Sequence, residues 1–175
     1  MPEYLIDTDA GTCELYRYNN VPDLSGTSMA KWMVETLAEH RGDTEYNGFV
    51  ATIQKWFYGS IVQAAWCATT VSYLLTLTGR AVHEENVNRL RVALEKSGWG
   101  TMFNRDSIPE RLEQGDICFW LWDGSVMQDG SSKHVNLVEH PSVGNTVFCI
   151  GGNQKNKICT LEYDRNKLYA VYRLG

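Results

Sequence analysis

The first half of the chain places apolar residues at intervals of three and four, which is the period of an α-helix, over four segments. We predict helices over residues 25–42, 48–58, 67–78 and 83–97. A glycine stands at or just beyond the end of each segment, as is common at helix C-termini. Ser25 or Thr27 is a suitable N-cap for the first of them.

After Trp99 the pattern changes to short apolar runs separated by turns. We predict strands over residues 116–122, 134–139, 146–151, 157–163 and 167–173, with a long polar loop over 123–133. Helices followed by a meander of strands predict an α+β fold, with N-terminal helices packed on an antiparallel sheet of about five strands. We assign residues 1–24 to an irregular N-terminal arm and residues 25–175 to a single domain.

Composition and charge narrow the range of functions. The chain has 175 residues and a formal net charge of -5, which argues against a nucleic-acid-binding surface. No apolar run approaches the roughly 20 residues of a membrane span. The N-terminal residues have neither the basic start nor the apolar centre of a signal peptide, so we expect the protein to be cytoplasmic at synthesis.

The five cysteines are Cys13, Cys67, Cys118, Cys149 and Cys159. The odd number and the lack of a signal peptide favour free thiols over a disulfide framework. No close pair of Cys or His residues has the spacing of zinc ligands.

Cys67 is the candidate nucleophile because it stands at the predicted start of the third helix. Free backbone N–H groups and the helix dipole favour a thiolate there, so we expect a lowered thiol pKa. The same N–H groups can bind the oxyanion of a tetrahedral intermediate. A buried core cysteine is the alternative, since free cysteine is among the most buried residue types.

A cysteine nucleophile needs a base and a third group that orients the base. His134 opens a predicted strand and shares a face with Asn136 and Val138. If the Cys67 helix packs on that face, thiol and imidazole can meet at the end of the sheet. Asn153 follows two glycines at the end of the next strand and is placed to orient the ring. We expect the other histidines to be surface residues, namely His40, His83 and His140.

The order of these motifs resembles the CHAP-type branch of the NlpC/P60-like cysteine peptidases. The motifs are Trp-Cys before an apolar helix, Gly-Asp-Ile opening a strand, His-Val starting the next strand, and then Gly-Gly-Asn-Gln at 151–154. Residues 45–48 and the apolar positions after them are similar to the helical lead-in of the small phage-associated subgroup. The resemblance covers roughly residues 28–175.

The resemblance implies a papain-like fold and a peptidoglycan hydrolase, an amidase or endopeptidase of phage endolysin type. Cys67 matches the nucleophile, His134 the general base and Asn153 the residue that orients the base. Further candidates for oxyanion or substrate contacts are Gln63, Trp66 and Gln154. Many members have a glutamate two residues before the asparagine, where this chain has Gly151.

The implied mechanism is hydrolysis of an amide in the wall peptide through an acyl-enzyme, without metal or organic cofactor. The bond and the wall type stay open, as does a targeting partner or an accessory protein of immunity or holin type. The enzyme would act on the wall after release or delivery. Two alternatives remain: an inactive binding module of the same fold, and a toxin or effector that cleaves another amide. We expect Trp66, Trp99, Trp120 and Trp122 either to line a groove or, more often for such residues, to fill the core.

Overall fold

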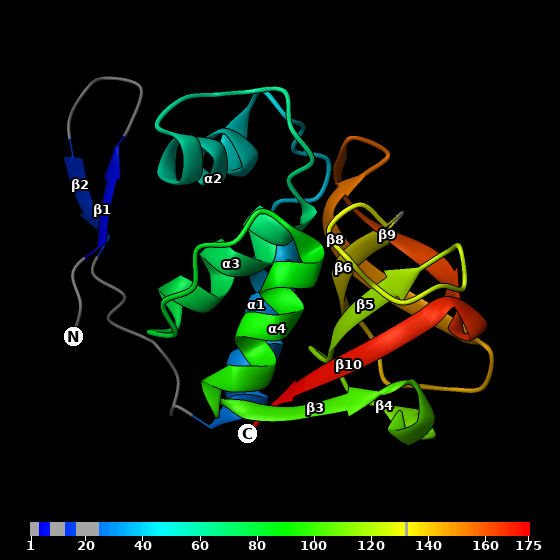
Figure 1. Ribbon diagram of the computed structural model, residues 1–175. Coiled ribbons are helices and arrows are strands. Elements are labelled where there is room, and N and C mark those ends of the chain that lie inside the picture. The colour runs from blue at the N-terminus through cyan, green and yellow to red at the C-terminus, as the bar shows by residue number, and fades with distance from the viewer. Residues whose placement is uncertain (1–3, 8–12, 17–24, 132) are drawn as a thin grey trace.

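The computed structural model describes residues 4–7, 13–16, 25–131 and 133–175 (Figure 1). The four predicted helices are present as α1 (Gly26–Glu39), α2 (Gly48–Tyr58), α3 (Cys67–Leu77) and α4 (Val87–Ser97). Ser25 caps α1 through its side chain, which accepts the backbone N–H of Ser28. Helix α4 starts later than predicted because Asn86 caps it and accepts the N–H groups of the second and third helical residues.

Six strands form one sheet in the order β3-β10-β5-β6-β8-β9, and all neighbouring pairs are antiparallel. Their bounds are β3 (Gly100–Asn104), β5 (Ile117–Leu121), β6 (Lys133–Val138), β8 (Thr146–Gln154), β9 (Lys157–Asp164) and β10 (Leu168–Leu174). Two short strands, β4 (Arg111–Leu112) and β7 (Ser142–Val143), pair separately, and 3-10 turns lie at 105–107 and 165–167.

The α+β class with an antiparallel sheet is confirmed, with six strands in place of about five. The strand that the pattern missed is β3, an edge strand without fully buried positions. Its residues lack the alternation of apolar and polar side chains that marks a half-buried strand.

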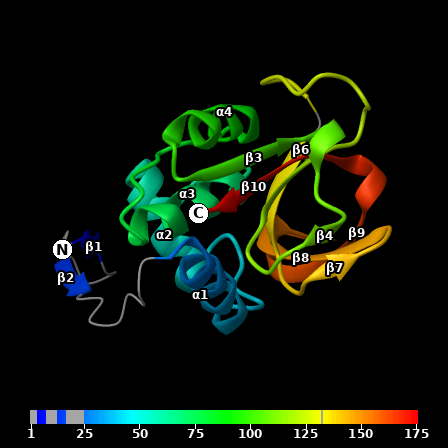
Figure 2. The same ribbon diagram turned by 90° about the horizontal axis from the view of Figure 1, so that it is seen from below.

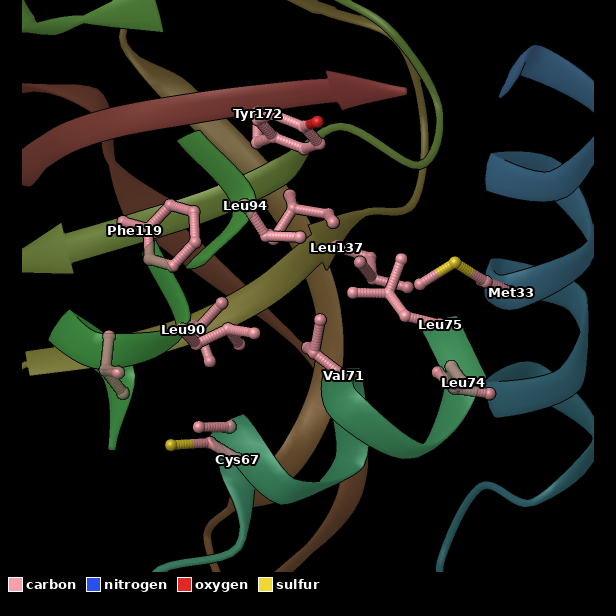
Figure 3. Close-up of a cluster of buried hydrophobic side chains, with 14 of the residues drawn as sticks. Met33, Cys67, Val71, Leu74, Leu75, Leu90, Leu94, Phe119, Leu137 and Tyr172 are labelled. Atoms are coloured by element: carbon pink, nitrogen blue, oxygen red, sulfur yellow. The ribbon is translucent and has the colours of Figure 1, made fainter. Parts of the chain in front are cut away.

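The two faces of the sheet bury two different apolar clusters. Helices α1, α3 and α4 cover one face, where Phe119, Val135 and Leu137 pack with residues of α3 (Figures 1 and 3). The opposite face buries a second cluster, which contains Cys118, Trp120, Val138, Cys149, Leu168 and Val171. Seen from below, the helices lie on one side and the curved sheet on the other (Figure 2).

Helix α3 is the central helix, because every one of its residues is buried. Its first turn lies directly on β8 at Gly152, which has no side chain to keep the helix away. A Cβ atom added at Gly152 would lie 2.3 Å from the Thr70 hydroxyl and 2.7 Å from the Trp66 ring. The glycine therefore sets how closely the start of α3 approaches the sheet.

The predicted irregular arm contains a hairpin of β1 (Tyr4–Asp7) and β2 (Cys13–Tyr16), which corrects the prediction for those residues. Helix α2 is the neighbour of β1 in the fold (Figure 2). The rest of the predicted arm, residues 1–3, 8–12 and 17–24, lies outside the described residues. No helix in the described part of the chain is long and apolar enough to cross a membrane.

We predict that Gly152→Ala lowers the free energy of unfolding by about 1–3 kcal/mol, because the new methyl group overlaps α3. Chemical denaturation measures the change. Gly130→Ala is the matched control, since a Cβ there meets no atom within 4 Å. Equal stabilities of the two variants would contradict the close approach of α3 to β8.

Candidate active site

Cys67 is the first residue of α3, and Trp66 before it provides no side-chain cap for the helix. The backbone N–H groups of the first turn are therefore available to another acceptor. The sulfur lies within hydrogen-bond reach of the backbone N–H groups of Val135, Ala68 and Cys67 itself. Figure 3 shows Cys67 at the edge of the cluster that packs between α3 and the sheet.

The pKa of the Cys67 thiol is raised by burial, although the three backbone N–H groups and the charge of Lys133 act in the opposite direction. The residue is only 5% exposed. The prediction of a lowered pKa is therefore wrong for this structure. The expected N–H groups are present, but the loss of solvation outweighs their effect on the thiolate.

His134 lies near the start of β6 and is paired across the sheet with Trp120. Directly opposed residues share a face, so His134 belongs to the face of the second cluster, away from α3. The condition that α3 packs on the face of His134, Asn136 and Val138 is therefore not met. Helix α3 packs on the face of Val135 and Leu137 instead, because these residues form the continuous apolar surface that a fully buried helix needs.

Gln154 is the hydrogen-bonding centre around the His134 ring. Its amide nitrogen donates to the backbone carbonyl oxygens of Cys149, at 3.2 Å, and of Cys159. These contacts turn the Oε1 atom toward the ring, where it accepts from Asn136 Nδ2 at 2.9 Å and from the Tyr163 hydroxyl at 2.9 Å. His134 Nε2 lies 3.2 Å from the same oxygen.

The orientation of Gln154 determines the tautomer of His134. An amide oxygen only accepts hydrogen bonds, so Nε2 of the ring carries the proton and Nδ1 keeps a lone pair. Burial lowers the pKa of His134 to about 4, while the hydrogen bond to Gln154 acts to raise it. The ring is therefore neutral at pH 7 and can accept a proton at Nδ1.

The contact with the His134 ring that we predicted for Asn153 is made by Gln154. Asn153 has a positive φ of 57° and lies where the register of β8 and β9 shifts, between Gly151 and Gln154. This irregularity turns Gln154 toward His134. Asn is among the residues that tolerate such a backbone, so Gly-Gly-Asn was a signal of an irregular strand end.

Cys67 lies against one face of β6, and the His134 side chain projects from the other face. Both residues are next to Val135. The sulfur contacts the Val135 N–H, and the imidazole belongs to the preceding residue. Within residues 25–131 and 133–175, no hydrogen bond joins the thiol directly to the ring. The thiol and the ring are therefore neighbours of adjacent residues of β6 and lie on opposite faces of that strand.

The remaining residues that the sequence singled out differ in their exposure to solvent. Gln63 is exposed on the loop before α3, and its candidate role stays a prediction. Trp66 and Trp120 are fully buried, so both belong to the core and not to a groove. Trp122 is 41% exposed, and its ring centre lies 6.3 Å from that of His134. His83 and His140 are exposed as predicted, whereas His40 is half-buried and stacks on Phe49.

Asn136 and Tyr163 are site residues that the sequence analysis did not assign. Both donate to Gln154 Oε1, and Asn136 Oδ1 also accepts the indole N–H of Trp120 at 2.7 Å. The alternation of the strand already placed Asn136 on the face of His134, but it did not indicate a role for the amide. Tyr163 is nine residues beyond Gln154, and only the β8–β9 pairing brings its ring close.

Four of the cysteines have side chains that the structure describes, and all four are free: Cys67, Cys118, Cys149 and Cys159. The prediction for Cys13 falls on a side chain outside that description. In the described ranges no group of three His, Cys, Asp or Glu residues could hold a metal ion. Comparison of the sequence with models of protein families and with curated proteins finds no match.

We predict that burial of neutral His134 makes the fold less stable in acid. The pKa of His134 is lowered from 6.5 to about 4, so the unfolded chain binds a proton that the folded protein excludes between these pH values. The contribution of neutral His134 to the free energy of unfolding is fully present above pH 6.5. About 3 kcal/mol of that free energy is lost as the pH falls to about 4.

The measurement is the difference in free energy of unfolding between His134→Gln and the native protein as a function of pH. This difference should shrink on acidification, because the variant has no titrating ring. His140→Gln is the control, since His140 is exposed. Parallel curves for His134→Gln and the native protein would contradict a lowered pKa.

Proposed function

We propose that the protein is a cysteine-dependent amide hydrolase of papain-like, NlpC/P60 type that acts on the peptide part of bacterial peptidoglycan. The observation that carries this proposal is the hydrogen bond from His134 Nε2 to Gln154 Oε1, at the strand end that Cys67 contacts. An imidazole with one nitrogen bound to an amide oxygen and the other free is the arrangement of a general base in a Cys-His-amide triad.

Each group has a defined role in the proposed reaction. The Cys67 sulfur attacks the carbonyl carbon while its proton passes to His134 Nδ1. Backbone N–H groups at the start of α3 stabilise the oxyanion, with Gln63 as a further donor on the preceding loop. His134 then protonates the leaving amine, and a water molecule, deprotonated by the same ring, hydrolyses the thioester. Gln154 orients the ring throughout.

The resting state of this pair is a neutral thiol beside a neutral imidazole. Burial raises the pKa of Cys67 and lowers that of His134, so neither group favours its charged form at pH 7. Proton transfer therefore accompanies the attack and does not precede it. It also requires the ring to reach the sulfur around the Val135 peptide, since the two side chains start from opposite faces of β6.

Peptidoglycan as the substrate is supported by the resemblance of the motif order to the CHAP-type enzymes. The proposal is also supported by the order of elements, because the helices precede the sheet along the chain, Cys67 stands at the start of α3 and His134 lies on β6. An enzyme with this substrate acts after release or delivery to the wall, with or without a targeting partner. An effector that cleaves another amide with the same residues is the second candidate.

We predict that Cys67→Ala and Cys67→Ser abolish the release of products from purified peptidoglycan, measured by mass spectrometry. Loss of the sulfur removes the nucleophile, while the small side chain keeps the packing of α3. Cys118→Ala is the control, because Cys118 lies in the second cluster on the opposite face and should retain activity with some loss of stability. Normal turnover by Cys67→Ala would refute the proposal.

We also predict that His134→Ala lowers kcat/KM by about 10²–10⁴-fold, as loss of a general base does. Gln154→Ala should lower it more than Asn153→Ala, because the imidazole contacts Gln154. The acid limb of the kcat/KM profile should lie near pH 4, where the ring becomes protonated. A larger effect of Asn153→Ala, or an acid limb at the ordinary histidine pKa, would show that the assignment of the third residue or of the base is incorrect.

A further inference from the structure

The segment that connects α2 to α3 is held in place by two buried side chains (Figure 1). Gln54 Oε1 accepts the backbone N–H of Val62 at 2.9 Å, and Glu45 Oε1 accepts the backbone N–H of Ala64 at 3.2 Å. Gln54 is fully buried and Glu45 is only 4% exposed. The proposed reaction uses neither of these side chains. They attach one edge of the segment that leads into Cys67 to α2 and to the loop before it.

The spacing of these two hydrogen bonds shows which way the backbone of Gln63 points. The bonded N–H groups are two residues apart, which is the repeat of an extended strand, and exposed residues alternate with half-buried ones over 61–65. In an extended chain the N–H and C=O of one residue point to the same edge, and those of the next residue point to the other edge. The backbone groups of Gln63 therefore point away from the two side chains that hold the segment.

The outer edge of this segment is unpaired. Among the residues that the structure describes, none forms a hydrogen bond with the backbone N–H or C=O of Gln63. Backbone groups without a protein partner stay in contact with solvent, because burying them unpaired is costly. Gln63 is itself exposed. One free donor and one free acceptor therefore lie on the same edge of the chain, on the loop that continues into Cys67.

We propose that Gln63 binds the peptide part of the substrate by exchanging two backbone hydrogen bonds with one residue of that peptide, which lies extended along residues 61–65. Addition of a strand to an unpaired edge is a common mode of peptide binding. A residue of an extended peptide presents one donor and one acceptor on the same edge, which matches what Gln63 offers. The Gln63 side chain stays free for contact with the oxyanion.

This inference rests on the proposed function and adds the binding mode of its substrate. The segment runs directly into α3, so the peptide is held next to the helix start that carries Cys67. Main-chain hydrogen bonds do not depend on the side chains of the peptide, which therefore leaves the choice of amide to other contacts. Glu45 and Gln54 act as positioning residues, because they hold the inner edge of the segment while the substrate binds to the outer edge.

Amide hydrogen exchange, followed by NMR on Cys67→Ala, tests the geometry without turnover. In the free protein the N–H of Gln63 should exchange rapidly, whereas those of Val62 and Ala64 should be protected by their hydrogen bonds. The probe is N-acetylmuramoyl-pentapeptide, which contains the glycan–peptide amide and the amides of the stem. At about ten times its dissociation constant it should slow exchange at Gln63 about tenfold. Exchange at Gln63 that stays unchanged up to the solubility limit of the probe would overturn the inference.

Two substitutions at position 63 separate the backbone from the side chain. Gln63→Ala and Gln63→Pro both lack the side-chain amide, but only Gln63→Pro also lacks the N–H. The KM of Gln63→Pro for the same probe should be about tenfold above that of Gln63→Ala, with kcat values within about twofold of each other. Gln63→Pro should be no less stable than Gln63→Ala, whereas Ala64→Pro should be less stable because it leaves Glu45 without its donor.

A matched pair at position 45 tests the positioning role. Glu45→Gln keeps an oxygen that accepts the Ala64 N–H, and Glu45→Leu does not. Glu45→Leu should raise KM about tenfold and speed hydrogen exchange at Ala64, and Glu45→Gln should restore most of both losses. A Glu45→Gln variant as impaired as Glu45→Leu would show that the hydrogen bond to Ala64 is not the role of Glu45.

The outcomes also separate this inference from the proposed function. Equal KM values for Gln63→Pro and Gln63→Ala, together with normal Cys67-dependent cleavage, would overturn the inference and leave the proposed function standing. Protection of Gln63 by the probe without any cleavage of wall material would refute the proposed function, and the bound peptide would then not be a substrate.

Discussion

The structure depends on the burial of α3 between the sheet and the other helices. A helix with no exposed residue needs an apolar surface along its whole length, and β6 and β8 provide that surface through Val135, Leu137 and the bare backbone of Gly152. The same contact fixes the first turn of the helix against the start of β6. Cys67 therefore meets the Val135 N–H as a consequence of core packing, before any functional requirement is considered.

Burial also determines the electrostatic state of the site. The start of a helix favours a thiolate, but the Cys67 sulfur is almost without solvent, and the cost of burying a charge there exceeds the effect of the neighbouring N–H groups. The His134 ring is subject to the same cost, and its pKa falls. Both groups thus rest in the neutral form.

The sequence was sufficient for what local patterns determine. The period of apolar residues predicted all four helices and five of the six strands of the main sheet, because those elements bury one face or are buried throughout. It also located Cys67 at a helix start. The face of His134 could not be predicted, because alternation shows which residues share a face but not which face the helix covers. Gln154 contacts His134 in place of the predicted Asn153 because of a register shift, and only the pairing of β8 with β9 defines that shift.

The segment that precedes His134 ties the start of α4 to the sheet. The Asp129 carboxylate accepts hydrogen bonds from Asn88 at 3.0 Å and from Arg89 at 3.2 Å, at the start of α4. These contacts lower the pKa of Asp129, so it stays charged at neutral pH. Met127 of the same segment is buried in the cluster that contains Cys67.

The same segment also packs against the cluster that contains Cys67. The segment before β6 is held at Asp129 from the helical side and ends in the strand that carries His134, so it links α4 to that strand. Met127 adds to the apolar cover on the Cys67 side of the sheet, whereas Trp122 and Val126 stay exposed on the same segment. The segment between β5 and β6 therefore places one side chain in the cluster of Cys67 and leaves two others exposed, while Asp129 ties it to α4.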